Sequence, residues 1–153
     1  MQIREICTRE VVHCGRDTSV AQIAQLMRNH HVGDVVVAEP QHGKLIPVGI
    51  VTDRDLVVQV LAQGVGPDTL TAQDLMSDEL ITVTETEVVY DAMWHMRSKG
   101  IRRLPVVDER KFLVGVLTAD DVTEFLAEEL TEVARIVPRQ MKLEKSARAP
   151  IAA

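Results

Sequence analysis

Two Thr-x-x-Asp pairs, Thr52 with Asp55 and Thr118 with Asp121, are the residues whose types and spacing best suit binding chemistry. Each Thr ends an apolar run typical of a strand, and each Asp falls in the first turn of a following helix. Free backbone N–H groups and the positive end of a helix favour a phosphate at such a junction, where the Thr hydroxyl adds a donor. The carboxylate can accept hydrogen bonds from two adjacent hydroxyls, such as those of a ribose.

The same spacing also describes a helix capping box, with Thr as the N-cap and Asp at the third helical position. A single pair would indicate a cap alone. Capping and ligand binding can coexist, so the choice depends on the sequence around the pairs.

That surrounding sequence repeats. Gly49 matches Gly115 at an offset of 115 − 49 = 66 residues, the offset that also relates the two Thr-x-x-Asp pairs, whereas apolar positions upstream match at an offset of 69. The three extra residues of the first copy fall around 40–44, where Pro and Gly indicate a turn. A length difference confined to a turn indicates a true structural repeat.

Each copy predicts a short strand, a helix, two strands and a closing helix. The first copy places these at 11–12, 19–30, 33–38, 45–52 and around 56–61, and the second at 80–81, 87–99, 101–107, 112–118 and around 122–137. Residues 71–76 predict one helical turn in the connector. Neither copy alone supplies enough apolar surface, so the two are expected to share one body.

Each copy resembles a CBS motif, and together they resemble a CBS pair, or Bateman module. The resemblance runs from about Ile6 to Glu129 and is most specific in Gly-Ile-Val-Thr-Asp-Arg-Asp-Leu at 49–56, Leu-Met-Ser at 75–77 and Gly-Ile-Arg-Arg-Leu-Pro-Val-Val-Asp at 100–108. It implies a mixed α/β (α+β) fold of two tandem β-α-β-β-α motifs, related by a pseudo-twofold axis with two clefts between them. It also implies an adenosine-containing ligand (AMP, ADP, ATP, NAD or S-adenosylmethionine) and a homodimer through the CBS helices.

Within this family pattern, a binding role for both pairs is favoured over capping alone. One of the adjacent arginines at 102 and 103 should reach a phosphate, because neighbouring strand residues point to opposite faces. Those arginines could instead form surface ion pairs, and the purine-wall residues suit the core equally well. The second site is expected to comprise Ile81, Thr82, Ile101, Arg102, Arg103, Leu117, Thr118 and Asp121. The first is expected to comprise Val12, His13, Val32, Gly33, Val51, Thr52, Arg54 and Asp55.

The two sites differ in sequence. In the first copy the positions of the two arginines hold Gly33 and Asp34. A carboxylate near a phosphate is unfavourable unless Arg54 or a cation intervenes. The site with Thr118 and Asp121 is therefore expected to hold a phosphorylated ligand better.

Composition argues against several other classes of protein. The chain has 17 basic and 23 acidic side chains, and a net charge of −6 disfavours a nucleic-acid partner. No apolar stretch approaches the ~20 residues of a membrane span, and a cytoplasmic location with reduced Cys7 and Cys14 is expected. The histidines lack a metal-ligand spacing with these cysteines, so no metal is expected. No pairing of nucleophile and base is visible, so the protein is expected not to be an enzyme.

The chain is expected to divide into a first motif at 1–66, a connector and second motif at 67–137, and a basic flexible tail at 138–153. The tail carries four basic and one acidic side chain, or +3, which leaves −6 − 3 = −9 on the remainder. The last helix should end before Pro138, and its apolar face could clasp a dimer mate.

The sequence thus favours a non-catalytic regulatory module that binds an adenine nucleotide and thereby alters contact with an unidentified protein. The alternative is a ligand-free scaffold that acts through its dimer surface. The long amphipathic final helix and the unequal first site motivate this alternative.

Overall fold

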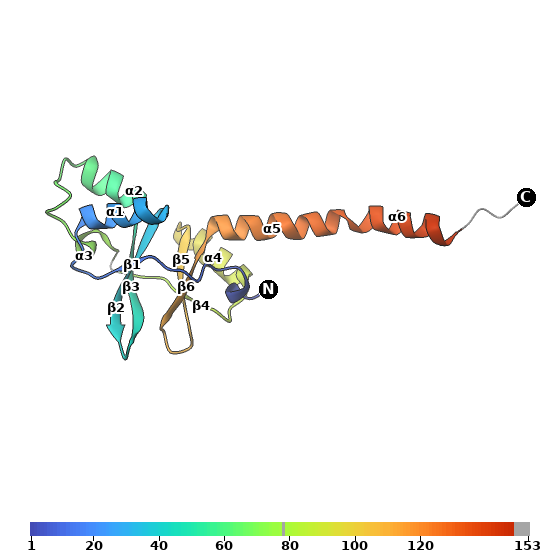
Figure 1. The fold of residues 1–153 in the computed structure, drawn as a ribbon, viewed down its shortest axis with the longest axis horizontal. Coiled ribbons are helices and arrows are strands. Elements are labelled where there is room, and N and C mark those ends of the chain that lie inside the picture. Colours follow the sequence, from blue (N-terminus) through green and yellow to red (C-terminus); the bar gives the residue numbers. More distant parts are fainter. Residues whose placement is uncertain (78, 149–153) are drawn as a thin grey trace, which may run out of the picture.

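The computed structural model describes residues 1–77 and 79–148. Figure 1 shows two small sheets next to each other and a long helical rod that runs away from them. Each sheet has three strands, in the orders β1-β2-β3 and β4-β5-β6. The two sheets meet where β3 contacts β6.

The predicted fold class and order of elements are confirmed in both copies. The first copy contains β1 (His13–Cys14), α1 (Val20–His30), β2 (Asp34–Gln41), β3 (Lys44–Thr52), α2 (Asp53–Asp55) and the π-helical turn η2 (Leu56–Leu61). The second contains β4 (Val83–Thr84), α4 (Val89–Lys99), β5 (Arg103–Val107), β6 (Leu113–Thr118), α5 (Ala119–Ala134) and α6 (Ile136–Ala147). The short helices η1 (Ile3–Glu5) and α3 (Ala72–Leu75) precede the first and second copies.

The short first strands lie two and three residues further along than the apolar pairs at 11–12 and 80–81 predicted. Parallel pairing places His13 opposite Val36, and Val83 opposite Val106. Apolar residues before these strands, such as Val12 and Ile81, pack against the two cores instead. Core packing therefore explains the apolar side chains of Val12 and Ile81, while the Val12 carbonyl still accepts a hydrogen bond of 3.0 Å from the Val36 N–H of β2.

The segments that precede each copy are exchanged between the copies. Ile3 is fully buried in the core of the second copy, whereas Ala72 and Leu75 of the connector are buried in the core of the first. Thr8 and Val116 exchange two backbone hydrogen bonds of 2.9 Å, which fix the N-terminal segment to β6. The N-terminal segment of the predicted first motif (1–66) therefore packs against the second copy.

Two equivalent glycines make this exchange possible. A Cβ atom on Gly115 would lie 2.9 Å from the Thr8 backbone oxygen and 3.0 Å from the Cys7 Sγ atom. A Cβ atom on Gly49 would lie 2.5 Å from the Met76 Sδ atom. The repeated glycine thus gives room for a chain segment that crosses directly over β3 or β6.

The prediction that the last helix ends before Pro138 is wrong. The helical rod is interrupted only at Arg135, and α6 continues to Ala147 (Figure 1). Pro138 is tolerated because it lies in the first turn of α6, where a backbone N–H has no helical partner to lose. Residues 138–147 are therefore helical rather than a flexible tail, and 149–153 lie outside the described residues.

Candidate functional site

A cavity of about 800 Å³ opens between the two copies. One wall comes from the end of β3 and the start of α2 in the first copy. The opposite wall comes from the connector after α3 and from the residues that enter β5 of the second copy. Of the residues predicted from sequence, the cavity is lined by Thr52, Arg54, Asp55, Ile81, Ile101, Arg102 and Arg103.

This cavity combines residues that were predicted for two different sites. The arginines of the second copy line the same cavity as Thr52 and Asp55 of the first, whereas Thr118 and Asp121 do not line it. The cause is the contact between the two copies, which places the start of β5 opposite the start of α2. Both arginines also lie beside Thr118, because Arg103 is its strand partner and Arg102 pairs with Asp120, so the predicted site at Thr118 and Asp121 stays a prediction.

The Thr52–Asp55 pair forms a complete capping box on this cavity. The Thr52 backbone N–H and hydroxyl donate to Asp55 Oδ2 over 2.8 and 2.9 Å, and the Asp55 N–H donates back to the Thr52 hydroxyl over 3.3 Å. Gln59 Nε2 lies 3.3 Å from Asp55 Oδ1. The cap thus engages one carboxylate oxygen, while the other faces a cavity-lining amide.

The Thr118–Asp121 pair forms the same cap at the start of α5. The Thr118 N–H and hydroxyl each donate to Asp121 Oδ2 over 2.7 Å, and the Asp121 N–H donates to the Thr118 hydroxyl over 3.1 Å. Capping is thus shown for both pairs. The two pairs differ in their surroundings, because only Thr52 and Asp55 line the large cavity.

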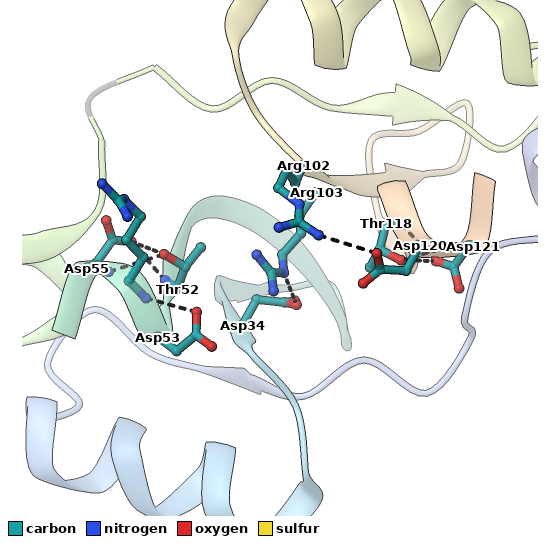
Figure 2. A network of polar contacts seen from close by, with 10 residues as sticks. Asp34, Thr52, Asp53, Asp55, Arg102, Arg103, Thr118, Asp120 and Asp121 are labelled. Carbon is teal, nitrogen blue, oxygen red and sulfur yellow. Dashed lines mark hydrogen bonds and ion pairs between the residues drawn. The ribbon is translucent and has the colours of Figure 1, made fainter. Parts of the chain in front are cut away.

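Arg103 reaches across to the first copy. Its Nε atom lies 2.7 Å from Asp34 Oδ1, and the two side chains are 24% and 12% exposed. Figure 2 shows this ion pair between the two helix starts, with Thr52 and Asp55 on one side and Thr118 and Asp121 on the other. Burial raises the pKa of the Asp34 carboxyl, and the Arg103 guanidinium opposes that rise.

Arg102 points away from Asp34 and towards its own copy. Its Nη2 atom lies 3.3 Å from Asp120 Oδ1, and both side chains are largely exposed. The two arginines thus differ in their surroundings: Arg103 is half-buried between the copies, and Arg102 forms a surface ion pair. Both still line the cavity.

Two predicted wall residues belong to the core instead. Val51 and Leu117 are fully buried in the cores of the first and second copies, so a ligand in the cavity cannot contact them. Ile50, one residue earlier in β3, lines the cavity. Adjacent strand residues face opposite sides of the sheet, so a one-residue error in the prediction selects the wrong face.

The remaining predicted residues lie away from the cavity. Thr82 lines a separate hollow of about 350 Å³, Val12 packs against the first core, and His13 is exposed on β1. Val32 is half-buried outside the cavity lining. Gly33 lies against the ion pair, because a Cβ atom there would be 2.7 Å from Arg103 Nη2.

Several cavity residues were not predicted from sequence. They include Asp53 and Gln59 on the first copy and Met76, Ser77 and Glu79 on the connector. A signal for the connector residues was present, since Leu-Met-Ser at 75–77 is one of the segments that carry the family resemblance. Segment 75–77 forms a wall of the cavity because the connector that precedes the second copy packs against the first.

Among residues 1–77 and 79–148, the structure shows no group of three or more His, Cys, Asp or Glu side chains placed to hold a metal ion. Within the same ranges, no helix has both the length and the apolar character needed to cross a membrane.

Comparison with known proteins identifies relatives along most of the chain. The CBS domain model matches twice, over residues 3–62 and 72–128. An uncharacterized protein of Methanopyrus kandleri is 39% identical over 124 residues, 81% of this chain, and the match spans only 62% of that relative's length. Hypoxic response protein 1 of Mycobacterium tuberculosis is 32% identical over 128 residues, or 82% of this chain and 85% of that protein.

Solved structures share the arrangement of the two copies. The CBS domain protein PAE2072 from Pyrobaculum aerophilum, complexed with AMP, has a TM-score of 0.72 and 29% identity, covering 79% of this chain and 89% of that one. The CBS domain pair of protein MJ0100, in complex with 5′-methylthioadenosine and S-adenosyl-L-methionine, has a TM-score of 0.73 and 26% identity, covering 84% and 98%. With the family model matching two successive segments, the chain belongs to the CBS domain family and is a CBS domain pair.

Proposed function

We propose that the protein is a non-catalytic sensor whose cavity between the copies binds an adenosine-containing ligand with at most one phosphate. The observation that carries this proposal is the cavity itself. It combines the carboxylate of Asp55, the guanidinium groups of Arg102 and Arg103, and apolar side chains in about 800 Å³. That volume falls within the usual range of small-molecule sites.

Each part of the ligand has a matching group in the cavity. The oxygen of Asp55 that the cap does not use can accept hydrogen bonds from the ribose hydroxyls. Ile50, Ile81 and Ile101 supply apolar walls for the purine. Arg103 donates to the phosphate with the help of Arg102.

The charge of the lining favours AMP over ligands with more phosphates. Among the described residues it holds three arginines at 54, 102 and 103 against the carboxylates of Asp53, Asp55, Asp74 and Glu79. Each additional phosphate charge would meet an environment without excess positive charge. We therefore infer tighter binding of AMP than of ATP, with S-adenosylmethionine, which has no phosphate, as the alternative ligand.

The structural neighbours support this class of ligand. One of them was crystallised with AMP, and another with 5′-methylthioadenosine and S-adenosyl-L-methionine. An AMP phosphate at Arg103 would compete with Asp34 for the guanidinium and so change the contact between the two copies. That change would alter the surface offered to a regulated protein in the cytoplasm.

We also infer a homodimer formed through the CBS helices. Tyr90 and Trp94 on α4 are 74% and 52% exposed, although large aromatic side chains of this kind are enriched in interfaces. α4 packs against α5, so both helices contribute to one face of the molecule.

Calorimetric titration of the full chain with AMP, ATP, NAD and S-adenosylmethionine tests the ligand proposal. Wild type should bind AMP, and Asp55→Ala should weaken binding at least tenfold. Asp121→Ala is the matched control, because it removes the equivalent cap outside the cavity and should leave AMP affinity within about twofold. Absence of binding by all four ligands, or equal losses in both variants, would refute the proposal.

A ligand-free scaffold is the second candidate, favoured by the apolar side chains exposed along α5 and α6. Native mass spectrometry of gently purified protein distinguishes the two. A stoichiometric adenosine compound in the spectrum supports the sensor and excludes a scaffold that works without ligand.

A further inference from the structure

The rod formed by α5 and α6 carries an exposed apolar stripe. Leu126, Leu130, Val133, Val137 and Met141 follow one another at spacings of 4, 3, 4 and 4 residues. This spacing keeps all five on one side of a helix. Their exposed fractions are 44, 69, 61, 61 and 54%. Such a stripe on a water-exposed helix indicates a surface that another element covers.

The two halves of the rod carry opposite charge. α5 contains six acidic and no basic side chains, whereas residues 135–148 contain five basic side chains and one acidic. The first half therefore has a net charge of −6, and the second of 5 − 1 = +4. A second rod of the same sequence, running in the opposite direction, would therefore place its basic half beside this acidic half.

The rod cannot satisfy this complementarity within one chain. α5 and α6 are separated by Arg135 alone, and its backbone is itself helical, with φ −82° and ψ −11°. A single helical residue does not form a reverse turn. Figure 1 accordingly shows α6 extending outward from α5 rather than folding back on it.

We propose that the rod pairs in antiparallel orientation with the rod of a second copy of this chain. A twofold axis near Val133 then places Leu126 opposite the partner's Met141 and Leu130 opposite the partner's Val137, because 126 + 141 = 130 + 137 = 267. The paired stripe of 16 residues extends over roughly 24 Å. α5 of each chain lies beside α6 of the other, so acidic halves meet basic halves along the whole contact.

Charge selects the antiparallel orientation. A parallel pair would place the acidic halves side by side and the basic halves side by side, which is unfavourable at close range. The same stripe in antiparallel orientation gains both apolar burial and opposite-charge neighbours. The acidic and basic halves thus determine the direction, and the apolar stripe supplies most of the stabilisation.

This pairing deepens the homodimer proposed above and is independent of the ligand. A failure of AMP binding would leave the pairing intact, and a failure of the pairing would leave the cavity intact. The two proposals are therefore distinguished by separate measurements on the same full-length chain.

Disulfide cross-linking under mild oxidation tests orientation and register. The double variant Leu126→Cys/Met141→Cys should form cross-linked dimers, because the two substituted positions face each other in the antiparallel pair. Leu126→Cys alone should give at least tenfold less dimer, since its two copies lie far apart. Wild type, which retains Cys7 and Cys14, measures the background. Efficient cross-linking of Leu126→Cys alone, or none by the double variant, would overturn the proposal.

Charge reversal in the double-cysteine chain tests the electrostatic part. Glu128→Lys, Glu129→Lys and Glu132→Lys together should reduce the dimer yield at least fivefold. Adding Arg135→Glu, Arg139→Glu and Lys142→Glu should restore the yield, because the two halves become complementary again. All six positions are exposed, and circular dichroism of each variant is the control for loss of helix. An unchanged yield after the first three substitutions would contradict the proposed orientation.

Discussion

Asp34 and Arg103 occupy equivalent positions in the two copies, since 103 − 34 = 69, and they form an ion pair with each other at 2.7 Å. Identical copies could not make this contact, because two arginines or two aspartates would meet at the same place. The difference between the copies is therefore part of what holds them together. It also brings the carboxylate that disfavours phosphate next to the arginine that favours it.

The ion pair predicts a specific charge-swap result. Arg103→Ala should lower the free energy of unfolding by about 1–3 kcal/mol, because it leaves the poorly hydrated Asp34 carboxylate without its partner. The double variant Asp34→Arg/Arg103→Asp should recover at least half of that loss, since the equivalent positions exchange roles. Urea unfolding measures both. A double variant less stable than the single one would show that the pair does not join the copies.

The buried Asp34 carboxyl predicts a pH dependence of stability. Its pKa in the folded chain is raised by burial despite Arg103, so the folded state holds the proton more tightly than the unfolded state. Protonated Asp34 therefore adds to the free energy of unfolding below its pKa in the unfolded chain, about 3.9. This stabilisation is lost as the pH rises through its pKa in the folded chain. The unfolding free energy of wild type relative to Asp34→Asn should therefore decrease between roughly pH 3 and pH 6. A relative stability that increases over this range would contradict the direction of the shift.

Asp34→Asn should also tighten AMP binding by about threefold to tenfold. The substitution removes a negative charge beside the proposed phosphate position and releases Arg103 from its ion pair. Adenosine, which lacks the phosphate, is the control ligand and should bind both proteins equally. If AMP affinity falls, or if adenosine responds as strongly as AMP, then Arg103 is not the phosphate partner.

The crossing of the N-terminal segment over β6 predicts a strong effect of Gly115→Ala. The added Cβ would meet the Thr8 backbone oxygen, which is fixed by hydrogen bonds to Val116, so relief requires a backbone shift. A loss of about 1–3 kcal/mol of unfolding free energy is expected. Gly15→Ala is the matched control, because its Cβ would enter open space, and it should change stability by less than about 0.5 kcal/mol. Equal effects in thermal or urea unfolding would argue against the crossing.

The sequence predicts local elements better than contacts between copies. The two strand-helix-strand-strand-helix units, the capping pairs and the connector turn all follow from local periodicity and spacing, and the structure confirms them. The lining of the cavity could not be predicted, because it depends on how the two copies face each other. Arg103 pairs with Thr118 in the sheet and also lines the cavity that contains Thr52.

Smaller errors have equally physical causes. The sequence predicts Val51 rather than Ile50 as a cavity wall, because periodicity indicates alternation but not which face is buried. Pro138 predicts a helix end, although proline is compatible with the first turn of a new helix. The exchange of segments at Ile3 and Leu75 leaves a signal only in the repeated glycines.

A crystal structure of the full chain grown with AMP would show whether one cavity, made by both copies, binds an adenosine-containing ligand. We expect ligand density between Asp55 and Ile101, with ribose hydroxyls on the Asp55 carboxylate and the phosphate on Arg103. Density at the Thr118–Asp121 cap alone, or an empty cavity at saturating AMP, would refute binding at this cavity.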